Sequence, residues 1–257
     1  MRQRVDSPGR SGRLLLLDLD GTIVDIQAEP GEAAIDASTL VALANLAAPD
    51  PLGLVIVTGR SLADADRMLG PLKLPIIASH GAEARVRGFS LLEAGPSIAA
   101  VREGIEEIAA RCPGVLVEWK PYSAAFHFRA VPEVGPRVWE ALCAFTQACP
   151  AFRIQGGRMV FEVVPTGISK ALAVEHLLQV PRYSRRRPIY VGDDPADEAA
   201  MAIVEAVGGT ALRVAGEHFG PSVADFDGPA AVRTWLAALL ADTDEIGGSV
   251  KAAIVGG

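Results

Sequence analysis

Two carboxylates that follow an apolar run are the residues best placed to do chemistry. Asp18 and Asp20 come directly after Leu14–Leu17, a run that predicts a buried strand of a parallel sheet. Side chains two residues apart on a strand point to the same side. We expect both to face the crevice that open α/β sheets form at the carboxyl ends of their strands. Because paired carboxylates repel unless a cation or a proton lies between them, the pair predicts Mg²⁺ and phosphoryl chemistry.

Three further polar clusters occupy equivalent positions. Thr58-Gly59-Arg60 follows the apolar run 54–57, Lys170 begins a predicted helix, and an acidic run at 192–198 follows the apolar residues 189–191. Alone, each cluster is typical of loops or solvated helix ends. Their conjunction, each beside a predicted strand or helix end, favours a shared catalytic site over four unrelated surface features.

The chemistry of phosphoryl transfer assigns a role to each type of group. One carboxylate attacks phosphorus, and a second protonates the departing oxygen and then deprotonates water. A hydroxyl and an ammonium hold the phosphoryl oxygens, and carboxylates supply the oxygen ligands that Mg²⁺ prefers. We predict Asp18 as the nucleophile and Asp20 as the general acid and base. The other assignments are Thr58, Gly59 and Lys170 for phosphate, Asp18, Asp193 and the Asp20 backbone carbonyl for the metal ion, and Asp194 and Asp197 as its outer supports.

The elements that must position these residues alternate between strand and helix. Predicted strands are 14–17, 54–57, 75–78, 189–191 and 211–214; predicted helices are 35–48, one beginning near residue 61, 169–178 and 195–207. Asp36 or Ser38, then Ser61 and Asp194, are the candidate N-caps. The alternation predicts an α/β fold with a doubly wound parallel sheet.

The middle of the chain breaks this alternation. Strands are expected at 115–119, 124–129, 152–155 and 159–164, with a hairpin turn at 155–158 and helices at 98–111 and 134–148. We therefore predict an inserted α+β cap domain over 85–165, a natural lid for a catalytic core of 14–84 and 166–241. Flexible tails are expected at 1–13 and 242–257.

Composition limits the partners and the location. The net charge of -7 argues against nucleic acid or an anionic membrane as a partner. No segment is apolar for long enough to span a bilayer, and the arginine-containing amino terminus lacks the apolar core of a signal peptide. The three cysteines form no C-x-x-C pair. We expect a cytoplasmic protein.

The order of the motifs resembles the haloacid dehalogenase (HAD) superfamily of phosphatases, with an insert placed like its type-two cap. The segments 57–60, 79–83, 117–120, 127–129 and 192–198 resemble the trehalose-6-phosphate phosphatase family, over about 14–240. The resemblance implies Mg²⁺-dependent hydrolysis of a small sugar phosphate, trehalose 6-phosphate, to trehalose and phosphate through an aspartyl phosphate; it does not indicate whether a protein partner binds. Thr58 stands where serine is usual, alanine follows Lys170 where glycine is common, and Pro195-Ala196 replaces a more polar pair. None of these departures removes a functional group.

The predicted cap carries the residues expected to contact the sugar. Glu118 and Lys120 alternate on one strand, as do His127 and Arg129 on the next. Such pairs either face solvent or offer hydrogen bonds to sugar hydroxyls, and the resemblance adds Glu162 to this set. Arg60, His80 and Glu83 complete the predicted substrate-binding residues.

Other functions remain open at this point. A phosphatase of another sugar phosphate, such as sucrose 6-phosphate or mannosyl-3-phosphoglycerate, would keep the same core motifs. A phosphoryl-accepting receiver domain or a catalytically silent sugar-phosphate sensor would share the acidic residues, the threonine and the lysine. Receivers lack a cap and an acid placed like Asp20.

Overall fold

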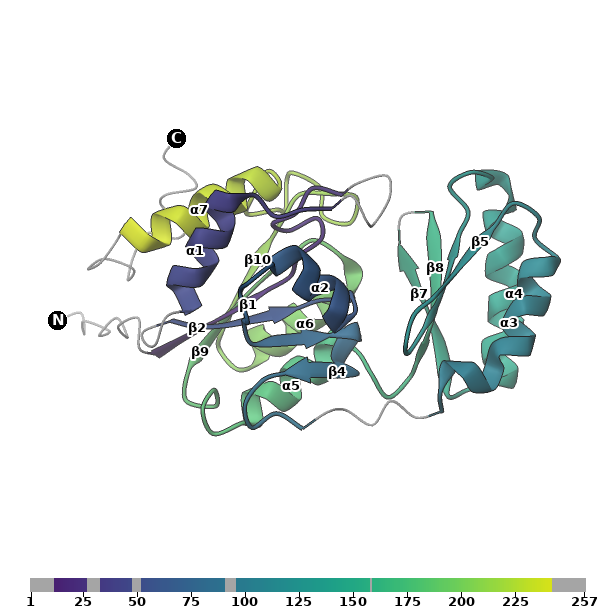
Figure 1. Cartoon of the computed structure of the whole chain (residues 1–257), viewed down its shortest axis with the longest axis horizontal. Helices are drawn as coiled ribbons and strands as arrows, with labels where there is room; N and C mark the ends of the chain where they lie inside the picture. Colours follow the sequence, from purple (N-terminus) through teal and green to yellow (C-terminus); the bar gives the residue numbers. More distant parts are fainter. Residues whose placement is uncertain (1–11, 27–32, 48–51, 91–95, 158, 242–257) are drawn as a thin grey trace. The chain divides into compact units, whose positions relative to one another are not determined.

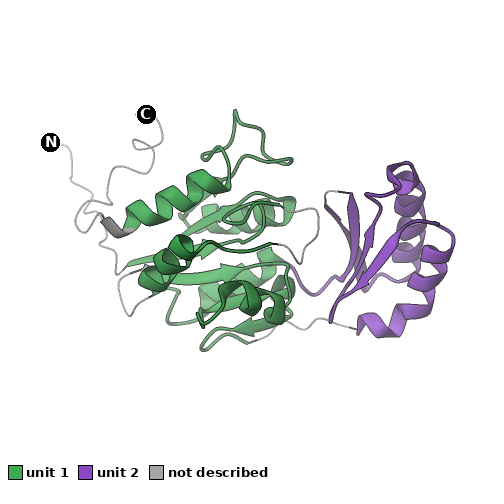
Figure 2. Cartoon of the chain, turned by 45° about the horizontal axis from the view of Figure 1, so that its top comes forward, with its two compact units in different colours: residues 1–90, 170–257 green, residues 91–169 purple. Residues whose placement is uncertain are grey.

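A computed structural model describes residues 12–26, 33–47, 52–90, 96–157 and 159–241. The chain forms two compact units, one of residues 1–90 and 170–257 and the other of residues 91–169 (Figure 2). The predicted insert was 85–165. Of the predicted tails, only residues 12 and 13 lie within the described part, and Arg13 begins the first strand. Among the described residues, no helix has the length and apolar character that crossing a membrane requires.

The sheet of the first unit is doubly wound, as predicted. Its strand order is β10-β9-β1-β2-β3-β4, and only the β3–β4 pair is antiparallel. The strands are β1 (Arg13–Leu17), β2 (Leu52–Val57), β3 (Ile76–Ala78), β4 (Glu83–Arg85), β9 (Arg187–Gly192) and β10 (Thr210–Arg213). β1 lies between β2 and β9, so the strand order reverses there. Ligands of open α/β sheets bind at such a reversal, beyond the carboxyl ends of the strands.

Helices cover both faces of this sheet, which explains why the β1 run is apolar at every position. Leu14–Leu17 are 0% exposed. Leu15 and Leu17 pack in a core with α1 (Ala37–Ala47), α2 (Leu62–Leu69) and α7 (Pro229–Ala241). α5 (Lys170–Gln179) and α6 (Pro195–Ala206) pack against each other, and α6 also contacts β9 and β10. Figure 1 shows α1 and α7 on one side of the sheet and α5 on the other.

Capping side chains fix where three helices begin. Asp36 accepts the backbone N–H of Thr39 at 2.8 Å, which identifies Asp36 rather than Ser38 as the cap of α1. Ser61 accepts the backbone N–H of Asp64 at 3.1 Å and caps α2. Asp194 caps α6 in a reciprocal capping box. The last cap is important for the site because it fixes the acidic run directly beyond β9.

The second unit has an antiparallel sheet with helices on one face. The strand order is β5-β6-β8-β7. The elements are η4 (Ile98–Val101), α3 (Arg102–Ala110), β5 (Leu116–Trp119), β6 (Ala124–His127), η5 (Pro132–Val134), α4 (Gly135–Ala148), β7 (Phe152–Gly157) and β8 (Val160–Pro165). Phe126 and Val163 pack with Ile105 of α3 and Leu142 of α4. The other face of the sheet is therefore free to carry the polar residues.

Two local predictions in this unit were wrong. Gly156 and Gly157 do not form the hairpin turn; they pair with Phe161 and Val160 at the end of β7. The backbone of Met159 has a positive φ of 51°, so the reversal lies beyond the glycines, next to Arg158, which is outside the described residues. The strand β6 ends at His127, and Arg129 lies in the following turn. The alternation argument therefore does not extend to Arg129.

Candidate active site

Asp18 lies just beyond β1 and is held by a buried lysine. The Nζ atom of Lys170 donates to Oδ1 of Asp18 at 2.7 Å, and Asp18 and Lys170 are 3% and 2% exposed. The backbone N–H of Asp18 donates to the carbonyl of Val191 at 3.1 Å, which ties it to β9. Lys170 bonds only to Oδ1, so it does not block Oδ2 of Asp18. A fixed, buried carboxylate beside an ammonium is a suitable arrangement for attack on phosphorus.

Thr22 links the two acidic clusters. Its hydroxyl lies 3.2 Å from Oδ2 of Asp18 and 3.3 Å from Oδ1 of Asp193. The turn that carries Thr22 requires Gly21, whose φ is +73°. A Cβ atom on Gly21 would lie 2.0 Å from Oδ2 of Asp193, so a larger residue would displace that carboxylate. The glycine therefore brings Asp193 close to Asp18.

Asp197 supports this cluster from behind. Its Oδ1 accepts Lys170 Nζ and the Tyr190 hydroxyl, each at 2.7 Å. Its Oδ2 accepts the backbone N–H groups of Asp193 and Asp194, at 3.1 and 3.2 Å. Four donors occupy both oxygens of a side chain that is 0% exposed. Asp197 thus orients Lys170 and the Asp193 loop.

Sequence reasoning missed Tyr190. It lies in β9, is 0% exposed, and donates its hydroxyl to Asp197. The run Ile189-Tyr190-Val191 reads as an ordinary apolar strand. The available signal was a hydroxyl inside a strand buried on both faces, since a buried tyrosine hydroxyl normally has a hydrogen-bond partner.

The donor set fits a divalent metal ion, which the resemblance to HAD phosphatases implies. Oxygens of Asp18, Asp193 and Asp197 lie within 4.8 Å of one another, and carboxylate oxygens are the ligands of hard divalent cations. The four bonds to Asp197 leave Asp18 and Asp193 as the carboxylates able to hold an ion directly.

Electrostatics also favours a cation at this point. Burial raises the pKa of Asp18 to about 7, and Asp193 and Asp194 add to the rise while Lys170 opposes it. Burial likewise raises the pKa of Asp193 to about 7, aided by Asp197 and Asp194. The cluster therefore holds more negative charge than Lys170 balances, and a proton or a cation relieves it.

Asp20 is engaged by Arg60. The guanidinium donates from Nε to Oδ2 and from Nη2 to Oδ1, both at 2.6 Å. The side chains of Arg60 and Asp20 are 14% and 38% exposed. Two parallel bonds between arginine and a carboxylate fix both position and plane. In this structure the arginine predicted to bind substrate thus contacts the predicted acid.

Thr58 and Gly59 follow directly after β2, and the imidazole ring of His80 supports them. Thr58 is 1% exposed, and its Oγ1 accepts the backbone N–H of Arg60 at 3.1 Å. A Cβ atom on Gly59 would lie 2.7 Å from two atoms of the His80 ring. His80 has a positive φ of 56° and is 5% exposed. This burial makes His80 a support of the loop rather than an exposed rim residue.

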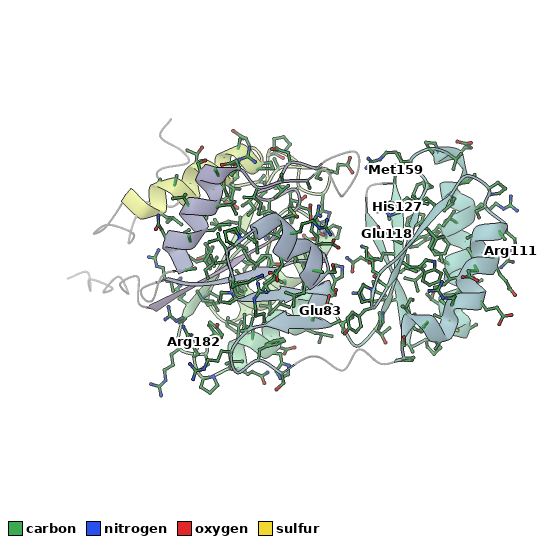
Figure 3. The ribbon with its side chains drawn as sticks, in the orientation of Figure 1. Glu83, Arg111, Glu118, His127, Met159 and Arg182 are labelled. Atoms are coloured by element: carbon green, nitrogen blue, oxygen red, sulfur yellow. The ribbon has the colours of Figure 1, made fainter. Side chains whose placement is uncertain are left out.

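Glu83 joins the same loop to the turn that carries His80. Its Oε2 accepts the hydroxyl of Ser79 at 2.5 Å and the backbone N–H of Leu62 at 3.1 Å. The second bond satisfies an otherwise open donor at the start of α2. The carboxylate of Glu83, labelled in Figure 3, therefore fastens the Thr58 loop to the turn after β3.

The polar face of the second unit's sheet contains two side-chain networks. His127 Nε2 lies 2.9 Å from Oε2 of Glu118, and Figure 3 shows these two residues side by side on the sheet. Lys120 Nζ donates to Oε1 of Glu162 at 3.0 Å, and the Ser123 hydroxyl donates to the same oxygen at 2.5 Å. Hydrogen bonding to His127 lowers the pKa of Glu118. The polar side chains of this face therefore bond to one another as well as facing outward.

Sequence reasoning also missed Ser123, Arg153 and Gln155. Arg153 donates to Oε1 of Gln155 at 3.2 Å, and the register places Gln155 directly opposite Glu162. The strand register could have indicated Gln155, since residues paired across two strands share a face of the sheet. Arg129 lies beyond β6, and its role stays a prediction.

The fold is shared with known phosphatases. It matches the Candida albicans trehalose-6-phosphate phosphatase C-terminal domain with a TM-score of 0.76, 20% identity, and coverage of 90% of this chain and 92% of that one. It matches a HAD-superfamily phosphatase from Bacteroides thetaiotaomicron with a TM-score of 0.61, 19% identity, and coverage of 93% and 97%. The fold, together with the order of the acidic residues, the threonine and the lysine along the chain, places this protein in the HAD class.

Proteins with similar sequences show to which family of the HAD class this chain belongs. The family described as Trehalose-phosphatase matches residues 16–219. Trehalose-6-phosphate phosphatase of Escherichia coli (strain K12) is 30% identical over 200 residues, 77% of this chain and 75% of that protein. A probable trehalose-phosphate phosphatase of Sinorhizobium fredii is 34% identical over 203 residues, 78% and 77% of the two chains. The chain belongs to the trehalose-phosphatase family.

Proposed function

We propose that this chain hydrolyses trehalose 6-phosphate to trehalose and phosphate, with Mg²⁺ and an aspartyl-phosphate intermediate on Asp18. Family membership and the names of the two relatives support the substrate. The observation that carries the chemistry is the buried Asp18, bonded to Lys170 through one oxygen only. A receiver-like or silent sensor function would not need Asp20 fixed by an arginine.

The first step transfers the phosphoryl group. Oδ2 of Asp18 attacks phosphorus, the bond from phosphorus to the sugar oxygen breaks, and Asp20 gives that oxygen a proton. Lys170 lies 2.7 Å from Asp18, so its ammonium is beside the oxygens of the transferred group. The Thr58 hydroxyl and the Gly59 N–H, at the end of the neighbouring strand, are the other phosphate donors in this proposal.

The second step regenerates the enzyme. Asp20, now ionised, takes a proton from water, and the oxygen of that water attacks the phosphorus of the aspartyl phosphate. The bond from phosphorus to Asp18 breaks, and inorganic phosphate leaves. Arg60 determines when Asp20 is available, because Asp20 must exchange at least one 2.6 Å bond to reach the leaving oxygen or the water.

A bound Mg²⁺ ion would neutralise the substrate phosphate and keep Asp18 ionised despite its raised pKa. Asp18, Asp193 and the backbone carbonyl of Asp20 are the groups that would hold it. Asp194 and Asp197 would support the metal site without holding the ion, since Asp197 accepts the backbone N–H groups of both Asp193 and Asp194.

In this proposal, the polar face of the second unit's sheet selects the sugar. Glu118, Lys120, His127 and Glu162 carry paired donors and acceptors there, which suits the hydroxyl groups of a disaccharide. Arg129 and the loop residues His80 and Glu83 were predicted for the same role. The internal contacts of His80 and Glu83 favour positioning of the Thr58 loop instead.

Phosphate release from a panel of sugar phosphates tests the proposal. The panel contains trehalose 6-phosphate, sucrose 6-phosphate, mannosyl-3-phosphoglycerate and glucose 6-phosphate, each with Mg²⁺ and with chelator. We expect trehalose 6-phosphate to have the highest kcat/KM and chelator to abolish turnover. Preference for another sugar phosphate would overturn the substrate, and no turnover of any member would overturn the enzymatic function.

A further inference from the structure

The first unit has a hollow at the end of the sheet opposite Asp18. Its volume is about 370 Å³. Its described lining combines the apolar residues Leu178, Pro188 and Val207 with Gly208 and the segment 184–187, Ser-Arg-Arg-Arg. Arg187 is the first residue of β9, whereas Asp193 follows its last. The hollow is therefore separated from the catalytic residues by the length of that strand.

The hollow carries positive charge on an acidic protein. Arg185, Arg186 and Arg187 all line it, and none of the lining residues in the described part of the chain is a carboxylate, although the chain has a net charge of -7. Within the described parts of the chain, Arg185 and Arg187 form no ion pair with an acidic side chain. Because charge concentrated in a concave site attracts counter-ions, the natural occupant is an anion.

Two of these guanidinium groups are held in place by backbone carbonyls. Arg186 Nη1 donates to the carbonyl of Arg13, and Arg187 Nε donates to the carbonyl of Gly208, both at 3.0 Å. A guanidinium has five N–H donors, so Arg187, which uses its Nε for Gly208, keeps donors for a ligand. Anchoring before binding lowers the conformational entropy that a ligand must overcome.

The strand register adds to the positive potential. Arg13 on β1 lies directly opposite Arg187 on β9, and like charges in opposite positions destabilise a sheet. Burial lowers the pKa of Arg13, and the charge of Arg187 lowers it further. An anion bound near Arg187 would relieve this repulsion.

A purely structural role explains only part of this arrangement. Arg187 satisfies a carbonyl just beyond the end of α6, as basic residues often do at helix ends. Arg185 makes no such bond and no ion pair within the described residues, yet it lines the hollow. Arg182, on the same loop and labelled in Figure 3, is exposed and is not part of the lining. It therefore provides a matched control.

We propose that this hollow binds a small organic phosphate, at a site distinct from the catalytic one. Its volume lies within the range of roughly 300–1,000 Å³ that is typical of small-molecule pockets and exceeds what inorganic phosphate needs. Arginine binds phosphate oxygens through two parallel bonds. The apolar lining residues Leu178, Pro188 and Val207 receive the organic part of the ligand.

The test uses phenylphosphonate, a probe whose carbon–phosphorus bond the phosphatase reaction does not cleave. Phenylglyoxal labels arginines, and mass spectrometry of peptides reports each arginine separately, so occupancy of the catalytic site does not obscure the result. We expect phenylphosphonate, at constant ionic strength, to protect Arg185 and Arg187 but not Arg67 or Arg182. Calorimetry should show at least about tenfold weaker binding to this site in R185Q/R187Q. The charge-matched R67Q/R182Q should bind like wild type.

Several results would overturn the proposal. Absence of protection at Arg185 would exclude the site, and equal protection of all four arginines would indicate diffuse attraction of anions. Equal affinity for inorganic phosphate and phenylphosphonate would contradict binding of an organic group by the apolar lining residues. Because Arg187 contacts Gly208, R185Q alone provides a variant with no described bond to lose. Phosphate release in R185Q should match wild type, since Arg185 lies outside the catalytic cluster.

Discussion

Arg60 holds both carboxylate oxygens of Asp20, through two bonds of 2.6 Å. The acid proposed to protonate the leaving oxygen is therefore fixed in position, and it cannot act without changing its contact with Arg60. The backbone N–H of Arg60 is bonded in turn to the Thr58 hydroxyl. One residue thus links the proposed acid to the proposed phosphate loop.

Arg60→Lys should lower kcat/KM most for substrates with poor leaving groups. Lysine keeps the charge but cannot form two parallel bonds, so Asp20 would be poorly oriented for proton transfer. We expect a loss of about 10- to 100-fold with trehalose 6-phosphate, within the range of general acid catalysis. The loss with p-nitrophenyl phosphate should be much smaller, because nitrophenolate departs without a proton. Arg67→Lys, an exposed position on α2, is the control, and equal losses on both substrates would assign Arg60 to the phosphate or to folding.

Tyr190→Phe should lower kcat about tenfold and leave KM near the wild-type value. The change removes only the hydroxyl that donates to Asp197, and one hydrogen bond to a charged group has roughly this effect on rate. Asp197 would then orient Lys170 less well, while no proposed substrate contact is lost. Tyr183→Phe is the control, since Tyr183 is also buried, at 3% exposed. If both variants lose activity equally, or if KM alone rises, Tyr190 has no positioning role.

Much of the catalytic cluster was predictable from the sequence, for a physical reason. Parallel strands that end at one edge bring their carboxyl ends together, so the apolar runs before Asp18 and Asp193 determined that these residues would approach each other. Lys170 followed from its place at the start of α5. Their proximity in the structure agrees with this reasoning.

Pairings between side chains were not predictable in the same way. Periodicity gives the face on which a residue lies but not its partner, so the Arg60–Asp20 pair and the Tyr190–Asp197 bond appeared only in the structure. The hairpin was misplaced because Gly156-Gly157 looks like a turn, whereas the paired strands extend beyond it. There, the cross-strand pairing outweighed the local preference of glycine for turns.

A divalent cation should stabilise the protein more at high pH than at low pH. Asp18 and Asp193 have pKa values raised to about 7, so the metal-free folded state binds more protons than the unfolded state between about pH 4 and pH 7. The stability of the metal-free protein therefore falls as pH rises across that window, and the cation replaces those protons.

The measurement is the increase in melting temperature on adding MgCl₂, at about pH 5 and about pH 8, with NaCl at matched ionic strength as the control. The increase should be larger at the higher pH and should be lost in Asp193→Asn. An increase that is equal at both pH values, or that persists in Asp193→Asn, would contradict a metal site at these aspartates.

Glu118→Gln should impair the sugar substrate selectively. Glu118 contacts His127 at 2.9 Å on the polar face proposed to choose the sugar, and a hydrogen bond to a charged group contributes about 1.5–3 kcal/mol. The kcat/KM for trehalose 6-phosphate should therefore fall at least about tenfold, while the value for p-nitrophenyl phosphate stays close to wild type. Glu107→Gln, an exposed position on α3 of the same unit, controls for the loss of one negative charge. Equal losses on both substrates would mean that Glu118 stabilises the sheet and does not select the sugar. The proposed substrate would then rest on family membership alone.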